Sequence, residues 1–249
     1  MSKNAESITP PSKAEPLGLN WARPLLFENS DASWRYSMRG SCFLCRFHSR
    51  FYAITARHCL SDFSSDAARI SGPIEGTQAL QFFDVREIGL PGNGQEDCSD
   101  LAFFLIEPAL ADQAILDRCC LDLTYCSGEA ALANETLIVV GYPWEQNSVE
   151  YENLRISTKG YAIHGRYHGT ADSKHCSRLS FETLGGLNNL DGLSGSPVIA
   201  FIKSGEDSYS RRFVGVLIRG SATSRQGSYV DSARVVYFLR QFDAHLQKS

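Results

Sequence analysis

The chain has 249 residues, a length typical of one or two domains. Hydrophobic residues make up 43% of it and charged residues 21%, a composition that excludes disorder over the whole length. With 24 Lys and Arg against 28 Asp and Glu, the net charge is −4. The chain therefore lacks the positive charge needed for general binding to nucleic acid or to an anionic membrane surface.

Residues 1–20 are polar and contain Pro10, Pro11 and Pro16. This composition predicts a flexible N-terminal leader, and the segment lacks the apolar run of a signal peptide. No later segment approaches the ~20 apolar residues that cross a bilayer. We therefore expect a cytoplasmic protein with no membrane partner, in which the cysteines are free thiols. The cysteines are Cys42, Cys45, Cys59, Cys98, Cys119, Cys120, Cys126 and Cys176.

Residues 21–249 are predicted to form one domain built mainly from short strands. Apolar runs of strand length, rich in Val, Ile, Phe and Tyr, alternate with turn residues from Trp34 onward. The runs are Cys42–Phe47, Tyr52–Ala56, Leu80–Val85, Leu101–Ile106, Leu137–Val140, Pro197–Ile202 and Phe213–Ile218. Many short strands separated by turns are typical of an all-β sandwich or barrel.

Two segments are predicted to be helical, a short one at Pro108–Asp117 and a longer one at Ser232–Gln247. Ser232 is expected to cap the longer helix, because a serine oxygen accepts hydrogen bonds from the first-turn amides. Apolar residues then recur at helical spacing, at Val235, Val236, Leu239, Phe242 and Leu246. We expect this apolar stripe to pack on the β core, with binding of a partner as the alternative.

Three short segments carry side chains suited to nucleophilic catalysis. In DGLSGSPV, Ser194 lies between glycines, which permit the backbone angles that expose a hydroxyl and direct amides toward one point. Serine is a weak nucleophile and needs a base to take its proton. The segment YAITARHCL places His58 at the end of an apolar strand, and SDLAFFLI places Asp100 at the start of another.

These segments resemble the motifs of the chymotrypsin-fold (trypsin-like) serine peptidases. That family has T-A-x-H-C around its histidine, matched by Thr55–Cys59, and D-L/I-A at its aspartate, matched by Asp100–Ala102. Its G-x-S-G-x-P motif is matched by Gly192–Pro197. The order of the motifs agrees, with 42 residues from His58 to Asp100 and 94 from there to the serine. The resemblance extends over about residues 35–245.

The resemblance implies an all-β fold of two six-stranded antiparallel barrels, at roughly 21–125 and 126–231, followed by a C-terminal helix at 232–247. It implies a serine endopeptidase that hydrolyses peptide bonds through an acyl-enzyme intermediate and needs no cofactor and no metal. Ser194 would attack the carbonyl carbon, His58 would take its proton and Asp100 would orient the imidazole. The backbone amides of Gly192 and Ser194 would form the oxyanion hole.

Each of these residues also has an ordinary structural interpretation. Ser194 would then lie in a plain turn, His58 would be a core histidine and Asp100 would cap a strand end. Asp97 is a second candidate for the acid, but it lacks the Leu-Ala that follows Asp100. The remaining histidines are interpreted as surface or structural residues: His48, His164, His168, His175 and His245.

The sequence departs from the secreted digestive members of the family just before the serine. Those relatives have an aspartate that pairs with a newly cut N-terminus, where this chain has Leu193. The form G-x-S-G-S-P is closer to the bacterial V8-like and HtrA-like branches. Since the N-terminal switch is missing, we expect control by a regulatory protein partner or by loop ordering.

The specificity pocket is predicted from the family pattern. Asn188, six residues before the serine, is expected at the pocket floor, where it offers no charge to a basic side chain. The segment that ends in Ile218, Arg219 and Gly220 is expected to pair with an extended substrate by β-augmentation. Gly220 and Gly227 are expected to leave room in the pocket walls. Arg219 either favours an acidic neighbour on the substrate or is simply solvated, and the residues before this edge do not predict glutamate specificity.

The cysteines allow two further interpretations. Cys42-x-x-Cys45 has metal-like spacing, but the adjacent Cys119 and Cys120 are poorly placed for one tetrahedral zinc ion. Cys59 follows the histidine as in disulfide-bonded relatives, so Cys42 or Cys45 is a candidate partner in an oxidising environment. The rival functions are thus a thiol- or metal-dependent protein, and a catalytically silent module that uses the same fold to bind peptides or act as a scaffold.

Overall fold

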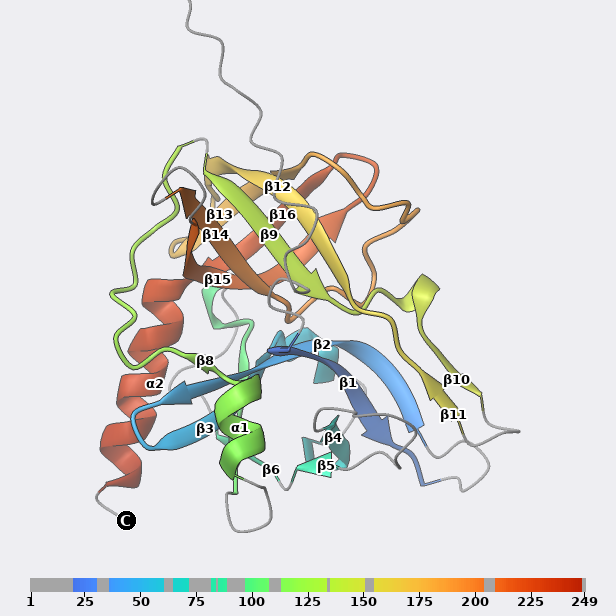
Figure 1. Ribbon diagram of the computed structural model, residues 1–249, viewed down its shortest axis with the longest axis vertical. Coiled ribbons are helices and arrows are strands. Elements are labelled where there is room, and N and C mark those ends of the chain that lie inside the picture. The colour runs from blue at the N-terminus through green and yellow to red at the C-terminus, as the bar shows by residue number, and fades with distance from the viewer. Residues whose placement is uncertain are drawn as a thin grey trace, which may run out of the picture.

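The structure is a computed structural model, and it describes residues 20–30, 36–60, 65–71, 82–83, 85–88, 97–107, 113–133, 135–150, 155–203 and 209–247. The expected leader therefore lies outside the described residues, apart from Asn20. The described chain forms two β lobes, one above the other in Figure 1, with a long C-terminal helix running beside both.

The N-terminal lobe is a strongly curved sheet with the strand order β5-β4-β1-β2-β3-β7-β6, and β8 pairs in parallel with β2. Its strands are β1 (Ala22–Glu28), β2 (Tyr36–Phe47), β3 (Arg50–Thr55), β4 (Ala68–Ser71), β5 (Phe82–Phe83), β6 (Val85–Ile88), β7 (Ala102–Ile106) and β8 (Leu121–Asp122). The central strands β3 and β7 are almost fully buried, as their continuous apolar runs predict. Among the described residues the two edge strands, β5 and β6, do not pair to close this sheet into a barrel.

The C-terminal lobe is a closed antiparallel barrel with the strand order β12-β13-β16-β15-β14-β9. Its strands are β9 (Thr136–Gly141), β12 (Tyr161–Thr170), β13 (Cys176–Phe181), β14 (Pro197–Lys203), β15 (Tyr209–Ser221) and β16 (Gln226–Asp231). A two-stranded hairpin of β10 (Ser148–Glu150) and β11 (Arg155–Ser157) extends from it (Figure 1). The predicted all-β architecture is thus confirmed.

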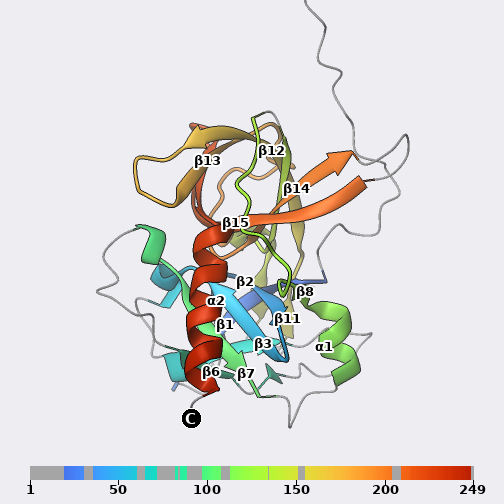
Figure 2. The ribbon, with the colours of Figure 1, turned by 90° about the vertical axis from the view of Figure 1, so that its left-hand side faces the viewer.

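The helix α2 (Ser232–Leu246) follows β16 and packs along the N-terminal lobe (Figure 2). Its buried stripe contacts β7, where the ring of Phe103 lies 5.9 Å from that of Phe238 and 5.1 Å from that of Phe242. Val235, Val236, Leu239 and Phe242 are buried, so the predicted core-facing stripe is confirmed. Because the helix begins on one lobe and packs on the other, it ties the two lobes together.

The longer helix begins at Ser232 as predicted, but the predicted capping role of Ser232 is wrong. Ser232 is the first helical residue rather than the cap, and its buried hydroxyl donates to the Glu129 carbonyl 3.3 Å away. The N-cap position is occupied by Asp231, whose side chain makes no capping hydrogen bond. The short helix α1 spans Gln113–Cys119, and residues 108–112 of the predicted segment lie outside the described residues.

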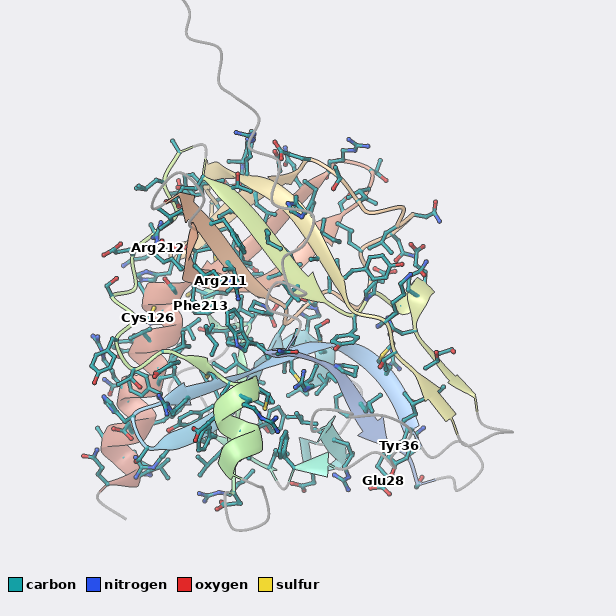
Figure 3. The ribbon with its side chains drawn as sticks, in the orientation of Figure 1. Glu28, Tyr36, Cys126, Arg211, Arg212 and Phe213 are labelled. Carbon is teal, nitrogen blue, oxygen red and sulfur yellow. The ribbon has the colours of Figure 1, made fainter. Side chains whose placement is uncertain are left out.

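One hydrophobic cluster extends across both lobes, and the C-terminal barrel has a second cluster inside it. Phe43 of β2 and Phe213 of β15 lie with their rings 5.4 Å apart, and Figure 3 places Phe213 beside Arg212 near the junction of the lobes. Arg212 also fixes the segment that crosses between the lobes. Its guanidinium donates to both carboxylate oxygens of Glu135, at 2.8 and 2.7 Å. Within the described residues, no helix is both long and apolar enough to cross a membrane.

Candidate active site

Two of the three candidate catalytic side chains meet because two strands are paired. β3 and β7 run antiparallel, with Thr55 opposite Ala102, so the end of β3 and the start of β7 lie at the same edge of the sheet. His58 lies in the 3-10 helix η2 (Arg57–Leu60), directly after β3. Asp100 lies between the 3-10 helix η4 (Asp97–Ser99) and β7.

Asp100 holds His58 through both of its carboxylate oxygens. One oxygen lies 2.7 Å from Nδ1 of His58, and the other accepts from its backbone amide at 2.9 Å. Because a carboxylate only accepts, Nδ1 carries the proton and Nε2 is the nitrogen left for proton transfer. This hydrogen bond, followed by one to Cys59, raises the pKa of His58 well above the usual value of 6.5.

Ser194 lies in a tight turn that only glycine can flank. Gly192 and Gly195 both have φ of 89°, in the left-handed region. A Cβ on Gly195 would lie 2.0 Å from the Ser41 carbonyl oxygen, and one on Gly192 would lie 2.4 Å from Cδ1 of Trp144. Both glycines are therefore required for the turn, which carries Ser194 to the lobe interface beside η2.

The turn leaves two backbone amides, those of Gly192 and Ser194, without a protein acceptor among the described hydrogen bonds. The Asp191 carbonyl accepts from the amide of Trp144 at 2.9 Å, and the Leu193 carbonyl accepts from the amide of Ser196 at 3.0 Å. In a trans peptide the N–H points opposite to the carbonyl, so the amides of Gly192 and Ser194 are directed away from these contacts. Within the described residues neither amide donates to the protein. These two amides are the donors that the sequence assigns to an oxyanion hole, and that role stays a prediction.

Ser41, at the middle of β2, connects the turn to the rest of the site. Its buried hydroxyl donates to the Gly192 carbonyl at 2.7 Å and accepts from the amide of Tyr142 at 2.8 Å. Its backbone amide donates to the Ser194 carbonyl at 2.9 Å, and its carbonyl accepts from the Thr55 hydroxyl at 2.7 Å. Ser41 thus links the N-terminal lobe to both residues that supply the candidate oxyanion hole.

The hydroxyl of Ser194 does not hydrogen-bond the imidazole of His58 in this structure. It donates to the Ile218 carbonyl at 3.3 Å, and no hydrogen bond between Ser194 and His58 exists among the described contacts. Catalytic hydrogen bonds are often loose without substrate and tighten when it binds. The Ile218 carbonyl belongs to the strand expected to pair with substrate, so a substrate amide that donates to it would compete for the same acceptor.

The 3-10 helix η2, the turn of Ser194 and the end of β15 border one cleft of about 420 Å³ between the lobes. The cleft is lined by Arg39, His58, Cys59, Trp144, Leu190, Asp191, Gly192, Ser194, Ile218, Arg219 and Gly220. A second hollow of about 370 Å³ shares Arg39 and Trp144 with it and continues toward β10. The cleft is therefore elongated, as binding of an extended chain requires.

The competing aspartate, Asp97, has a different role. One of its oxygens accepts from Arg219 at 2.6 Å and the other from the Ser173 hydroxyl at 2.7 Å. Both Asp97 oxygens are thus engaged away from His58, and Asp100 is the carboxylate on the imidazole. Arg219, which the sequence leaves as either a substrate contact or a solvated residue, is an exposed cleft residue paired with Asp97.

Two expectations about the specificity pocket are wrong. Asn188 is exposed and outside the cleft lining, because its backbone amide donates to the Glu145 carboxylate at 2.8 Å. Gly220 lines the cleft as expected, whereas Gly227 is buried behind it. Neither glycine leaves an open space, because Leu190 and Phe181 pack against Gly220, and Phe181 and Leu217 pack against Gly227.

All eight cysteines have free thiols in the structure. Cys59 forms no disulfide with Cys42 or Cys45, and its sulfur lies against Gly40, where a Cβ would be 2.7 Å from Sγ. Its thiol donates to the Ser194 carbonyl at 3.8 Å. Within the described part of the chain, no three His, Cys, Asp or Glu residues are placed to hold a metal ion.

Three residues of the site, Ser41, Trp144 and Leu190, were not predicted from the sequence. Ser41 is a serine within an ordinary strand run, and the residues that it contacts are about 100 and 150 residues away. Trp144 follows a Gly-Tyr-Pro turn that matches no motif. Of the three, only Leu190 could have been suspected from its position, because it lies between Asn188, the expected floor of the pocket, and Ser194.

No protein-family model matches this chain, and no curated protein is similar to it in sequence. Among solved structures, human heparin binding protein superposes with a TM-score of 0.62 at 15% sequence identity. The superposition covers 92% of this chain and 93% of that protein. The fold is therefore chymotrypsin-like, as predicted.

Proposed function

We propose that this protein is a serine endopeptidase that uses His58, Asp100 and Ser194 as a catalytic triad. The observation that carries the proposal is the Asp100–His58 hydrogen bond of 2.7 Å at the same cleft as Ser194. The two amides directed away from the turn beside Ser194 support it, since they provide donors for an oxyanion. The chymotrypsin-like fold supports it at the level of architecture alone.

The chemistry requires no group beyond these side chains. The Ser194 oxygen would attack the scissile carbonyl carbon while Nε2 of His58 takes the hydroxyl proton. The carbonyl oxygen would become an anion held by the amides of Gly192 and Ser194. Collapse of this intermediate breaks the C–N bond, and His58 returns the proton to the leaving amine. Water, activated by His58 in the same way, then hydrolyses the acyl-enzyme.

The substrate class that fits the cleft is an extended peptide or protein segment. Backbone groups of β15 at Ile218 to Gly220 border the cleft next to Ser194, and they would pair with the substrate backbone. The similar human protein is named for binding heparin, a polyanion. A net charge of −4 gives no basis for carrying that ligand over to this chain.

We further propose a cytoplasmic peptidase that has a regulatory protein partner and is nearest in motif to the bacterial V8-like and HtrA-like branches. The residue before the nucleophile supports this, because the buried Leu193 cannot pair with a new N-terminus. Full turnover by the purified protein alone would contradict control by a partner.

A catalytically silent peptide-binding module is the second candidate. The observation that favours it is the Ser194 hydroxyl, which hydrogen-bonds Ile218 rather than His58. A fluorophosphonate probe separates the two candidates, since it reacts only with an activated serine. We expect labelling of the wild type and none of Ser194→Ala. Absence of labelling from pH ~6 to ~10, a range that spans the ordinary and raised pKa of a histidine, would favour the silent module.

A further inference from the structure

The part of the cleft beside the edge of β15 is where a substrate's acyl side would lie. The scissile carbonyl must reach Ser194 with its oxygen toward the amides of Gly192 and Ser194. A substrate backbone paired with Ile218 to Gly220 then passes directly over this strand. The side chain that precedes the scissile bond would then lie against the cleft residues next to this strand, so those residues would set its allowed size and charge.

Leu190 closes this place from one side. It is 5% exposed, belongs to the core of the C-terminal barrel and lines the cleft. A Cβ added to Gly220 would lie 3.0 Å from Cδ1 of Leu190 and 3.4 Å from its Cβ. The absent side chain at Gly220 therefore makes room for Leu190 and not for a ligand.

Phe181 closes the same place from below. It is 3% exposed, and its ring would lie 3.7 Å from a Cβ on Gly220 and 3.0 Å from one on Gly227. Leu217 also packs against Gly227, with its Cδ1 3.1 Å from where that Cβ would be. The space next to both glycines is thus filled by apolar side chains of the chain itself, and Leu190 borders the recess of the cleft that remains beside β15.

The polar and charged side chains near the recess lie at its rim. Asn188 is turned out to Glu145, and Arg219 is paired with Asp97 while its side chain remains 66% exposed. Asp191 lines the cleft but is exposed to solvent. A long charged side chain would therefore find neither depth nor a buried counter-charge beneath it.

We propose that this protein cleaves after small apolar residues such as alanine, because Leu190 and Phe181 fill the pocket that would accept a larger side chain. The inference rests on the proposed endopeptidase activity and adds the substrate class to it. Leu190 is the specificity-determining residue, since it is the one of the two that borders the cleft.

The wild-type protein tests the proposal directly. Peptides of one sequence, varied only at the residue before the scissile bond, would be compared by kcat/KM. We expect alanine to be cleaved ~100-fold faster than phenylalanine, leucine, lysine or glutamate, since each misfitting methylene costs ~10-fold or more. A preference for phenylalanine would overturn the filled pocket. A preference for lysine or arginine would show that the Asp191 carboxylate binds the substrate side chain instead.

Two leucine variants test the role of Leu190. Leu190→Ala is expected to raise kcat/KM for leucine at this position at least ~10-fold relative to alanine, because a pocket opens above Phe181. Leu187→Ala is the matched control, since Leu187 is similarly buried in the same core but does not line the cleft. An unchanged ratio in the first variant, or an equal change in both, would overturn the proposal.

Phosphonate probes separate failure of this inference from failure of the proposed function. A fluorophosphonate without a side chain reports the activated serine alone, whereas aminoalkyl phosphonates carrying alanine or phenylalanine side chains also report the pocket. Labelling by the first probe with faster reaction of the alanine analogue supports both proposals. Labelling by the first probe with faster reaction of the phenylalanine analogue overturns only the pocket. No labelling by any probe overturns the activity and the pocket inference with it.

Discussion

The two sides of the cleft differ in how they are built. On the catalytic side the groups are polar and partly open to water: the side chain of His58 is 45% exposed and that of Asp100 is 15% exposed. On the side beside β15 the recess is bounded by Leu190 and Phe181, which belong to the core of the barrel. Hydrogen bonds therefore hold the side chains of the catalytic side in place, whereas close packing determines the shape of the side beside β15.

Because of this difference, substitutions on the two sides of the cleft should have different effects. Replacing a polar group by an isostere removes a hydrogen bond but leaves the packing, so turnover changes more than stability. Truncating a buried leucine removes transfer free energy and leaves a cavity, at a cost of about 2–5 kcal/mol. Substitutions on the catalytic side should thus alter rate, and those on the packed side should alter selectivity and stability together.

The largest effect is expected from Asp100→Asn. The two Asp100 oxygens accept from the backbone amide and from Nδ1 of His58, but asparagine has only one acceptor oxygen. With that oxygen on the backbone amide, the NH2 group faces Nδ1, so His58 is held in the wrong tautomer and turnover falls by ~10⁴. Asp97→Asn is the control, because it lies three residues earlier and contacts Arg219 and Ser173 instead. Peptide hydrolysis by both variants measures the difference. Near-normal rates for Asp100→Asn would show that the acid is misassigned.

A smaller loss is expected from Ser41→Ala. Without its hydroxyl the Gly192 carbonyl loses its donor, and the neighbouring peptide is free to turn. Removing an oxyanion donor outright costs ~10²–10³ in turnover, so we expect a loss of ~10–100-fold in kcat with KM little changed. Steady-state kinetics measures the split. An equal rise in KM with constant kcat would show that Ser41 acts only in substrate binding.

The pH dependence of kcat/KM gives a further test of the catalytic side. Only neutral His58 can take the serine proton, and the Asp100 hydrogen bond raises its pKa, so activity should rise with pH through a midpoint above 6.5. In Asp100→Asn the midpoint should move to lower pH while the maximum rate falls. A wild-type midpoint below 6.5 would contradict the effect of Asp100.

The catalytic side could be predicted from the sequence because its geometry is encoded locally. The Thr-Ala-x-His-Cys segment ends a strand, and Gly192 and Gly195 permit the left-handed angles that no other residue adopts easily. The pairing of β3 with β7 then brings His58 and Asp100 together without any further signal. Three short motifs in order therefore predicted that His58 contacts Asp100 and borders one cleft with Ser194, whereas the catalytic role of these residues stays a prediction.

The packed side could not be predicted in this way. Whether Gly220 opens a pocket depends on Phe181 and Leu190, which lie about 40 and 30 residues earlier in the chain and carry no motif. Its position six residues before Ser194 predicted Asn188 at the pocket floor. In the structure its hydrogen bonds to Glu145 turn that segment outward. The same limit applies to the cap of α2, where Ser232 binds a carbonyl of the crossing segment instead.

Asn188→Asp is expected to have the smallest effect of all, and it tests the boundary between the two sides. If Asn188 formed the pocket floor, a carboxylate there would attract basic side chains and raise cleavage after lysine or arginine by orders of magnitude. Because the residue is exposed and next to Glu145, we expect less than about a twofold change in kcat/KM for any peptide. Repulsion between two exposed carboxylates should lower stability by at most about 1 kcal/mol, which thermal unfolding can measure. A new preference for basic residues would place Asn188 in the pocket and remove the argument that Leu190 and Phe181 close it.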